Sequence, residues 1–329
     1  MLITSLWSLS KKPFISPLDK IKGVNLVAPP NPFTAQDLEP LKAMGNEWVS
    51  IVPYAFSKPN QSFVRWGSDR QWWGEKPDGV KQSIKMAREK GFRIMLKPHV
   101  WVIGQGWAGD FDIDMEAEWK KWEEEYSSYI LTYAEIAEEY KIDLLCVGTE
   151  YRIAAKERPE FWKSLIVKVR QKYSGNLTYA ANWDNYENVK FWGELDYIGI
   201  DAYFPLSENE NPKVDELISK WRPIETELKN FSDSVERKVI FTEYGYRSID
   251  YAASGHWTIE EKATSINQEA QKNSYEAMYK ALGDSDWYIG GFLWKWFPDH
   301  ENAGGSNCDR FTPQNKKVEE IIKNWNKKS

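Results

Sequence analysis

The sequence predicts an α/β fold, namely a (β/α)8 TIM barrel that forms a single domain. Three observations support this prediction. The length of 329 residues lies within the usual range of one such barrel. Short β-rich runs alternate with amphipathic stretches along the whole chain, which is typical of a parallel sheet wrapped by helices. No strand is followed by the glycine-rich turn of an open nucleotide-binding sheet.

The expected strands are rich in β-branched and aromatic residues and are bounded by turn-forming residues. In chain order they span residues 21–28, 47–56, 92–101, 144–150, 177–184, 196–204, 238–246 and 289–297. The active site of such a barrel lies at the carboxyl ends of its strands. The last residues of these runs are therefore the candidates for chemistry.

Three of the expected helices have clear signals. One spans 77–90 and is bounded by a proline and a glycine. Another spans 116–141, where aromatic residues at three- and four-residue steps indicate packing against the barrel and not a ligand site. The third spans 258–282 and opens with a capping box at Thr258. Residues 187–195 give the weakest helix.

The chain is divided into an N-terminal arm, residues 1–20, and a catalytic barrel, residues 21–329. The arm lacks a basic start and a clear cleavage site, so it is either the remnant of a trimmed leader or an ordinary extension. This segment is consistent with a cytoplasmic protein and with a secreted one. No stretch approaches the roughly 20 apolar residues of a membrane span.

The charge and cysteine content narrow the classes of partner. The net charge of −6 argues against nucleic acid and anionic membranes, so a neutral ligand is expected. The two cysteines do not form a disulfide framework and are interpreted as thiols. A monomer without a cofactor is expected. Aromatic residues make up 15% of the chain, and their faces suit both apolar cores and the C–H faces of sugar rings.

Two glutamates end expected strands in the same way. The apolar run 144–147 leads into Thr-Glu at Glu150, and the apolar run 239–241 leads into Thr-Glu at Glu243. Because these are the fourth and seventh strands, the carboxylates should face each other across the barrel mouth. A separation of roughly 5 to 5.5 Å suits a retaining glycoside hydrolase, in which one carboxyl group protonates the leaving oxygen and the other attacks the anomeric carbon.

Further side chains at or just beyond the strand ends are candidates for substrate contacts. They combine polar groups that can bond hydroxyls with aromatic rings that can stack on sugars. These candidates are Lys97, His99, Trp101, Trp107, Asn182, Asp201, Tyr203, Trp294 and Trp296.

Several of these candidates have alternatives. Lys97 shares a strand face with His99 and points either into the barrel mouth or to solvent. Asp201 lies one layer deeper and either contacts substrate or orients its neighbours. Asn182 and Trp183 should point to opposite faces, so only one of them is expected to reach the substrate.

The remaining alternatives concern tryptophans and histidine. Trp294 and Trp296 share a strand face, so one could form the floor of the reacting subsite while the other joins the core. Trp107 lies in a loop with little core to join, which favours stacking on a sugar. His99 is interpreted as a polar contact and not as a metal ligand, because the chain has three histidines and no HxH or HExxH spacing. No metal is expected.

The motifs "GVNL", "LKPHVW", "VGTEY", "DAYFP", "FTEYGY" and "GFLWKWFPD" resemble those of glycoside hydrolase family 113, in the large retaining clan A. The resemblance runs from about residue 21 to residue 299. It implies β-1,4-mannanase activity on mannan or manno-oligosaccharides, with Glu150 as the acid/base and Glu243 as the nucleophile. Tyr203 matches the position from which clan members hydrogen-bond the nucleophile. The clan usually has Asn before its acid/base, whereas this chain has Thr149, which leaves the contact to the sugar 2-hydroxyl unassigned.

Proteins with other functions could have the same strand-end glutamates and aromatic residues. A clan A hydrolase acting on β-glucan or xylan would use the same carboxylates, because substrate choice resides in the loops. A carbohydrate-binding barrel without catalysis and a metal-dependent hydrolase are further alternatives. The sequence is compatible with both endo and exo action.

Overall fold

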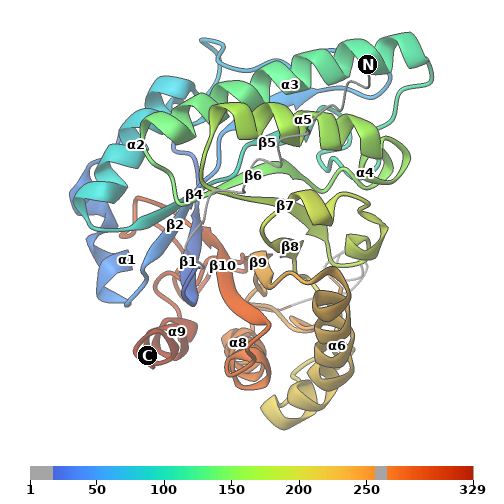
Figure 1. The fold of residues 1–329 in the computed structure, drawn as a ribbon. Helices are drawn as coiled ribbons and strands as arrows, with labels where there is room; N and C mark the ends of the chain where they lie inside the picture. Colours follow the sequence, from blue (N-terminus) through green and yellow to red (C-terminus); the bar gives the residue numbers. More distant parts are fainter. Residues whose placement is uncertain (1–17, 256–264, 329) are drawn as a thin grey trace, which may run out of the picture.

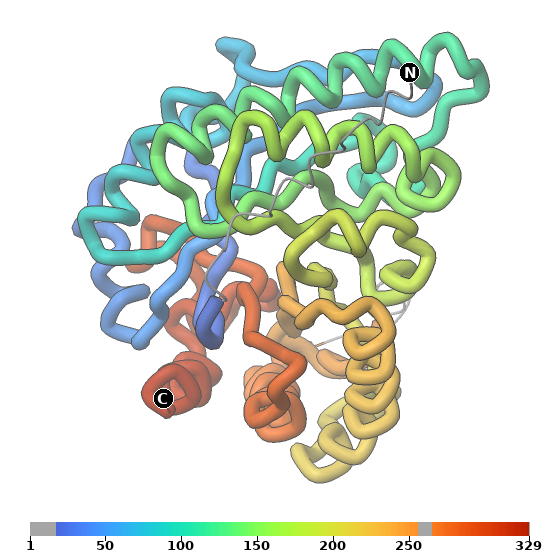
Figure 2. Tube along the Cα trace, viewed as in Figure 1, coloured from blue at the N-terminus to red at the C-terminus, as the bar shows by residue number. Residues whose placement is uncertain are grey.

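The computed structural model describes residues 18–255 and 265–328 of the chain, and a closed barrel of parallel strands forms its centre (Figure 1). The barrel strands are β1 (Ile21–Leu26), β2 (Trp48–Ile51), β4 (Arg93–Leu96), β6 (Leu144–Thr149), β7 (Asn176–Asn182), β8 (Ile198–Asp201), β9 (Val239–Tyr244) and β10 (Tyr288–Trp296). Figure 2 shows β1 in blue beside β10 in orange-red, where the first and last strands pair and close the barrel. The predicted (β/α)8 architecture is confirmed.

The helices lie around the strands and cover the outside of the barrel (Figure 1). They are α1 (Glu39–Ala43), α2 (Pro77–Glu89), α3 (Glu116–Glu139), α4 (Arg152–Glu157), α5 (Pro159–Lys172), α6 (Val214–Val235), α8 (Gln268–Leu282) and α9 (Val318–Asn326), with 3-10 helices η1 (Ala35–Leu38), η2 (Trp73–Glu75), η3 (Tyr186–Asn188) and η4 (Trp192–Glu194). The helices predicted at 77–90 and 116–141 are confirmed as α2 and α3. The prediction of a weak helix at 187–195 is wrong, because that segment holds only short 3-10 turns.

The helix predicted at 258–282 ends as expected but has a different start. Helix α8 begins at Gln268, where the side chain of Asn267 caps it by accepting a 2.9 Å hydrogen bond from the backbone N–H of Ala270. The capping box predicted at Thr258 lies outside the described residues. Residues 1–17 of the predicted N-terminal arm lie outside them as well.

The barrel interior changes from apolar to polar along its axis. Near the amino ends of the strands it is filled by a separate apolar cluster of Ile21, Trp48, Met95, Leu144, Tyr197, Ile240, Ile289 and Phe292. Nearer the carboxyl ends, the fully buried interior side chains include Asn25, Ser50, Lys97, Thr178 and Asp201. Buried polar groups of this kind require partners. Asn25, Lys97, Thr178 and Asp201 make hydrogen bonds there and form a polar layer under the mouth of the barrel.

Two predicted strands are each divided in the structure. The run 47–56 becomes β2 and then β3 (Tyr54–Ser57), and the run 92–101 becomes β4 and then β5 (His99–Val102). Strands β3 and β5 pair in parallel with each other and form a separate two-stranded sheet. We call this sheet the rim ribbon, because it continues two barrel strands beyond the barrel at the end where the active site is expected.

Prolines mark the division between barrel and rim ribbon. Pro53 and Pro98 lie opposite each other, since the pairing register is the same on both sides of them. Proline has no backbone N–H to donate to a sheet, so both strands lose a hydrogen bond at the same level. Beyond this level the two strands continue as a pair without the neighbours that they have in the barrel.

The two faces of the rim ribbon have different compositions. One face carries the rings of Tyr54, Phe56, His99 and Trp101, which line cavities at the barrel mouth. The other face is buried against α3, where Nε1 of Trp122 donates to Oγ of Ser57 at 3.3 Å. Alternation along the strands therefore directs a set of aromatic rings toward the barrel mouth.

Candidate active site

A cavity of about 800 Å³ opens at the carboxyl ends of the barrel strands. Its walls come from the rim ribbon, the loop after β5 and the ends of β6 to β10. Both glutamates predicted as catalytic, Glu150 and Glu243, line this cavity. It is therefore the candidate active site.

Glu150 follows β6 directly, and its backbone conformation is unusual. Its φ is +54°, a left-handed conformation that is uncommon for residues other than glycine. Its N–H donates to the carbonyl of Ala180 at 2.8 Å, which ties it to the neighbouring strand β7. The pairing of β6 with β7 shifts by one residue between Cys146 and Thr149. A bulge at this position redirects the following side chain, here the carboxyl group of Glu150.

The environment of Glu150 favours its protonated form. Burial, followed by the nearby carboxylates of Asp201 and Glu243, raises the pKa of Glu150 well above its usual value, against the opposing effects of Lys97 and Trp107. A carboxyl group that keeps its proton near neutral pH can act as a general acid.

Glu243 lies within β9, and its carboxylate has several partners. Oε1 accepts a 2.5 Å hydrogen bond from Nζ of Lys97, and Oε2 accepts a 2.7 Å hydrogen bond from the hydroxyl of Tyr203. The pairing of β8 with β9 shifts by one residue just before Glu243, as it does on β6 before Glu150. The two Thr-Glu sequences therefore have similar local backbone, and the hydrogen bonds from Lys97 and Tyr203 fix the orientation of the Glu243 side chain.

Lys97 and Asp201 form the layer beneath Glu243. Both side chains are 0% exposed, and Nζ of Lys97 lies 3.0 Å from Oδ1 of Asp201. Asp201 also accepts a 2.7 Å hydrogen bond from Oγ1 of Thr242. Burial alone would lower the pKa of Lys97, but the carboxylates of Asp201 and Glu243 raise it above the ordinary value. Lys97 is thus the shared cation of two buried carboxylates.

Replacing Lys97 by methionine should test this arrangement through stability. We expect Lys97→Met to lower the free energy of unfolding by about 3 kcal/mol, because two buried carboxylates lose their cation. Lys97 is among the groups that lower the pKa of Asp201, so without it this carboxyl group takes up a proton more readily and the loss should shrink as the pH falls. Urea unfolding from pH 5 to pH 8 measures both effects.

The matched control is Lys229→Met, which removes an exposed ion pair with Asp233 on α6. Exposed pairs contribute little, so this variant should unfold like the wild type. If Lys97→Met were as stable as the wild type at pH 8, the assignment of a buried ion network beneath Glu243 would be wrong.

His99 offers a neutral polar group to the cavity. Burial and, secondly, the charge of Lys97 hold the pKa of His99 well below its usual value, so the ring is neutral. Its Nε2 lies 3.5 Å from Oε1 of Glu243, and no hydrogen bond to Nε2 is made by the described residues. The ring is parallel to that of Trp294 at 6.2 Å between centroids. The His99 ring lines the cavity, while its buried Nε2 faces Glu243.

Trp107 lines the cavity, as expected for a substrate contact, and also contacts Glu150. Instead of presenting only an open face for stacking, it donates from Nε1 to Oε2 of Glu150 at 2.7 Å. Its ring also carries the guanidinium of Arg152 at 5.0 Å from the ring centroid, and Arg152 forms an ion pair with Asp110 of the same loop. Trp107 lines the cavity, but its main contact orients Glu150.

Four other predicted contacts lie on the cavity wall, namely Trp101, Asn182, Tyr203 and Trp294. Asn182 and Trp183 both line the cavity, although alternation predicts that only one should. The reason is that β7 ends at Asn182, so Trp183 belongs to a turn in which strand alternation no longer applies.

Three predicted substrate contacts lie behind the wall. Lys97, Asp201 and Trp296 are fully buried and do not line the cavity, so they are not direct contacts in this structure. For Trp296 the reason is a register shift, since β10 has one extra residue opposite β1 between Leu293 and Trp296. This shift places Trp294 and Trp296 on different faces, and Trp296 packs in the core beside the ring of His300 at 5.3 Å.

The cavity also contains residues that the sequence-based candidates omit. Arg152 and Phe311 line it, and Phe311 packs against the ring of Tyr203 at 5.9 Å. Phe311 comes from the long segment after β10, where no periodicity indicates which residue returns to the barrel mouth. Tyr54 also lines it, and the signal for Tyr54 is the strand-end pattern that it shares with His99. Among the described residues, no group of three His, Cys, Asp or Glu side chains could hold a metal ion.

Comparisons with known proteins agree with this geometry. A family model described as Glycoside Hydrolase Family 113 matches residues 30–316. A solved β-mannanase of that family from Alicyclobacillus acidocaldarius superposes with a TM-score of 0.81 at 23% identity, covering 94% of this chain and 97% of the other. A β-1,4-mannanase of the same family gives 0.78 at 24%, covering 95% and 100%.

A more distant solved structure shares the fold over part of its length. A β-glucuronidase from Ruminococcus gnavus gives a TM-score of 0.62 at 14% identity, and the match covers 93% of this chain but 49% of that one. No curated protein sequence matches the chain. Among the described residues, no helix is long and apolar enough to cross a membrane. The sequence identities to these solved structures are below 25%, so the structural matches establish the fold of this chain.

Proposed function

Because this chain belongs to glycoside hydrolase family 113, we propose that it cleaves β-1,4-mannosidic linkages in mannan and manno-oligosaccharides with retention of configuration. In this proposal Glu243 is the nucleophile and Glu150 is the acid/base. The observation that carries it is the contrast between two glutamates in one cavity. Glu243 is bound by an ammonium and a phenol, whereas burial and neighbouring charge favour the protonated form of Glu150.

The first step forms a bond between a carboxylate oxygen of Glu243 and the anomeric carbon. The bond from that carbon to the glycosidic oxygen breaks, and Glu150 gives its proton to the departing oxygen. Lys97 and Tyr203 each hold one oxygen of Glu243, which restricts the carboxylate to one orientation. The product of this step is a glycosyl ester on Glu243.

The second step hydrolyses that ester. Esterification removes the negative charge of Glu243, which is one of the causes that raise the pKa of Glu150. The pKa of Glu150 therefore falls after the first step, and its carboxylate can accept a proton from water. The oxygen of that water attacks the anomeric carbon and releases Glu243. Two inversions give net retention.

The wall of the cavity suits a neutral sugar. Trp101 and Trp294 present aromatic surface, and the neutral His99 ring adds no charge to the wall. The two family 113 structures described above are β-mannanases, which supports mannose as the bound sugar. A net charge of −6 is consistent with an uncharged polysaccharide.

Selectivity for mannose over glucose tests the proposed substrate. The two sugars differ in the 2-hydroxyl, which is axial in mannose. A site that bonds the axial group leaves its polar atoms unpaired when the epimer binds. We expect kcat/KM for manno-oligosaccharides to exceed that for cello-oligosaccharides of the same length by on the order of 100-fold.

The measurement is a comparison of mannotetraose and cellotetraose, with mannan, glucomannan, xylan and barley glucan as polymeric substrates. Comparable rates on the two tetraoses would reject the mannanase assignment and leave the two-glutamate mechanism in place. Turnover of xylan or glucan alone would favour another β-glycan as the substrate.

A further inference from the structure

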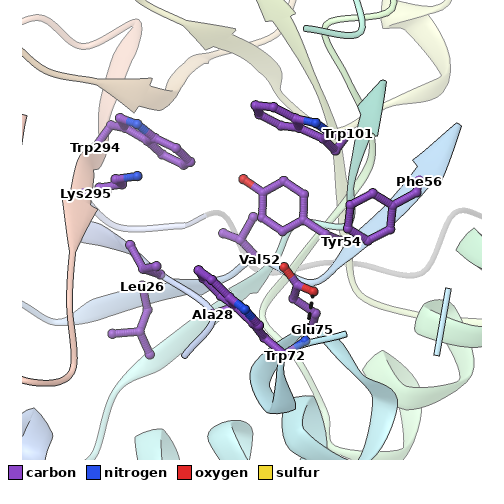
Figure 3. A pocket seen from close by; sticks show the side chains of 11 residues that line it. Leu26, Ala28, Val52, Tyr54, Phe56, Trp72, Glu75, Trp101, Trp294 and Lys295 are labelled. Atoms are coloured by element: carbon purple, nitrogen blue, oxygen red, sulfur yellow. Dashed lines mark hydrogen bonds between the residues drawn. The ribbon is translucent and has the colours of Figure 1, made fainter. Parts of the chain in front are cut away.

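The wall of the active-site cavity includes aromatic side chains of two origins. Tyr54, Trp101 and Trp294 come from β3, β5 and β10, and they also line a smaller cavity beside it (Figure 3). Phe311 comes instead from the long segment between β10 and α9, outside the strands of the barrel. The two steps of the proposed double displacement give this side chain no role.

Phe311 packs against the tyrosine that contacts the proposed nucleophile. The ring centroids of Phe311 and Tyr203 are 5.9 Å apart and the ring planes meet at 69°, an edge-to-face arrangement that aromatic pairs favour. The hydroxyl of Tyr203 donates to Oε2 of Glu243 at 2.7 Å. Burial, followed by the charge of Glu243, raises the pKa of Tyr203 well above its usual value, so the phenol keeps its proton and remains a donor.

The barrel sheet does not by itself fix the ring of Tyr203. Strand β8 ends at Asp201, and Tyr203 follows in a tight turn in which its N–H donates to the carbonyl of Asp201 at 3.2 Å. A tyrosine side chain rotates about its χ1 and χ2 bonds, and the hydroxyl at the far end of the ring moves most. Contacts to the ring itself therefore decide where the donor lies relative to Glu243.

Buried side chains hold the main chain around Phe311. The carbonyl of Phe311 accepts a 3.2 Å hydrogen bond from Nε2 of Gln271 on α8. The carbonyl of Arg310 accepts a 2.6 Å hydrogen bond from Nζ of Lys316, which also donates to Oγ of Ser248 at 2.8 Å. Gln271, Ser248 and Lys316 are all buried. Breaking any of these hydrogen bonds would leave a buried polar group unpaired, so the arrangement resists displacement.

The loop after β9 holds the residues just before Phe311. Arg247 forms an ion pair with Asp309 at 2.6 Å and donates from Nε to its carbonyl at 3.2 Å. Oγ of Ser248 donates to the carbonyl of Cys308 at 2.5 Å. We call residues 308–311 the anchored segment. Because β9 also carries the proposed nucleophile, the anchored segment is fixed to the strand whose carboxylate it serves.

A glycine leaves room for the ring of Phe311 beside the end of β9. A Cβ on Gly245 would lie 3.4 Å from Cδ1 of Phe311 and 2.7 Å from the carbonyl oxygen of Trp294. The second distance is too short for any side chain, so the close approach requires glycine. The ring of Phe311 is therefore positioned by the fold before a substrate binds, which is the condition for a group that pre-organises a reaction.

We propose that Phe311 is a positioning residue that holds the ring of Tyr203, so that the phenol keeps Glu243 in the orientation needed for attack on the anomeric carbon. The anchored segment in turn holds Phe311. This inference rests on the proposed function and assigns a role in the reaction to a segment outside the barrel strands. A displacement of about 1 Å in such a support can lower the rate by about 100-fold.

The test is a double-mutant cycle of Phe311→Ala and Tyr203→Phe, measured as kcat/KM on mannotetraose. We expect each single substitution to lower kcat/KM by on the order of 10-fold, because each weakens the support of Glu243. In the Tyr203→Phe background there is no hydroxyl to position, so adding Phe311→Ala should lower kcat/KM by less than about 2-fold. Phe311→Tyr keeps an aromatic ring and should retain most of the wild-type value.

The matched control is Trp101→Ala, which removes an aromatic ring of the same cavity wall but on the rim ribbon. Its loss should be equal with and without Tyr203→Phe, as expected for a side chain that does not act through Tyr203. A second variant, Arg247→Met, loosens the anchored segment without removing a residue that lines the active-site cavity. It should lower kcat/KM by about 3-fold, and only where the hydroxyl of Tyr203 is present. Circular dichroism and melting curves check that each variant is folded.

The outcomes separate the inference from its premise. An equal loss from Phe311→Ala in both backgrounds would mean that the ring acts on the substrate directly, and wild-type activity in Phe311→Ala would mean that it does not act at all. Either result would overturn the inference while leaving the proposed function intact. If the wild type cleaved only xylan or barley glucan, the proposed substrate would fail and the same cycle on that glycan would decide the inference. Failure to cleave any of these substrates would overturn both.

Discussion

Glu243→Ala should have no measurable activity on mannan, with a loss in kcat on the order of 10⁴-fold or more, as expected when the nucleophile of a double displacement is removed. The fold should survive, because Lys97 retains Asp201 as its ionic partner. The loss should be equally large on 2,4-dinitrophenyl β-mannobioside, since a better leaving group does not replace a nucleophile. Reducing-sugar release and dinitrophenolate absorbance measure the two activities.

Azide should restore turnover of the activated substrate by Glu243→Ala. The small anion can occupy the space left by the carboxylate, next to Lys97 and the hydroxyl of Tyr203. It attacks the anomeric carbon from the face that Glu243 used, so the product is an α-mannosyl azide, which NMR identifies. The matched control is Glu227→Ala, because Glu227 also accepts a hydrogen bond from a tyrosine, Tyr186, but lies outside the cavity. A folded Glu243→Ala without azide rescue would contradict the assignment.

Glu150→Ala should have a smaller and more selective effect. On mannan we expect kcat/KM to fall by about 10²- to 10⁴-fold, the usual contribution of general acid catalysis. On 2,4-dinitrophenyl β-mannobioside the first step needs no proton donor, so the ester on Glu243 should form rapidly. It should then accumulate, because no base activates water. A burst of dinitrophenolate followed by a slow steady state measures this behaviour.

The pH profile gives a second readout for the same variant. Since the pKa of Glu150 is raised and its protonated form is the active acid, wild-type kcat/KM should fall as the pH rises through that pKa. The alkaline fall should be absent from Glu150→Ala. Glu139→Ala, which removes an exposed carboxylate at the end of α3 that lines neither the active-site cavity nor the groove beside it, should keep it. An alkaline fall retained in Glu150→Ala would assign the titration to another group.

Most of the barrel can be predicted from the sequence because each strand corresponds to one short, continuous run of residues. Each barrel strand is a short apolar run bounded by turn residues, and these runs end where side chains such as Glu150 enter the cavity. The prolines that divide two of the predicted strands, Pro53 and Pro98, are a local signal as well. The start of α8 differs from the prediction because Thr258 gives a strong capping signal, whereas the structure has Asn267 as the cap.

The site is harder to predict in its details because strand alternation fails where a strand contains a bulge. Alternation predicts Trp296 on the same face as Trp294, but the extra residue in β10 reverses its direction. The loop position of Trp107 predicts stacking on sugar, and nothing in its loop sequence indicates that its N–H reaches Glu150 across 43 positions of the chain. Contacts of this kind depend on how distant loops meet, and local periodicity carries no information about them.

The rim ribbon has a consequence for how such an enzyme can diversify. The aromatic face of β3 and β5 lies above Pro53 and Pro98, while the buried ion network of Lys97 lies below them. Substitutions at Phe56 or Trp101 can therefore alter the groove that receives a polysaccharide without changing the pairing of the barrel strands. The outer face of the ribbon can therefore change in sequence while the buried layer of Lys97, Asp201 and Glu243 stays constant.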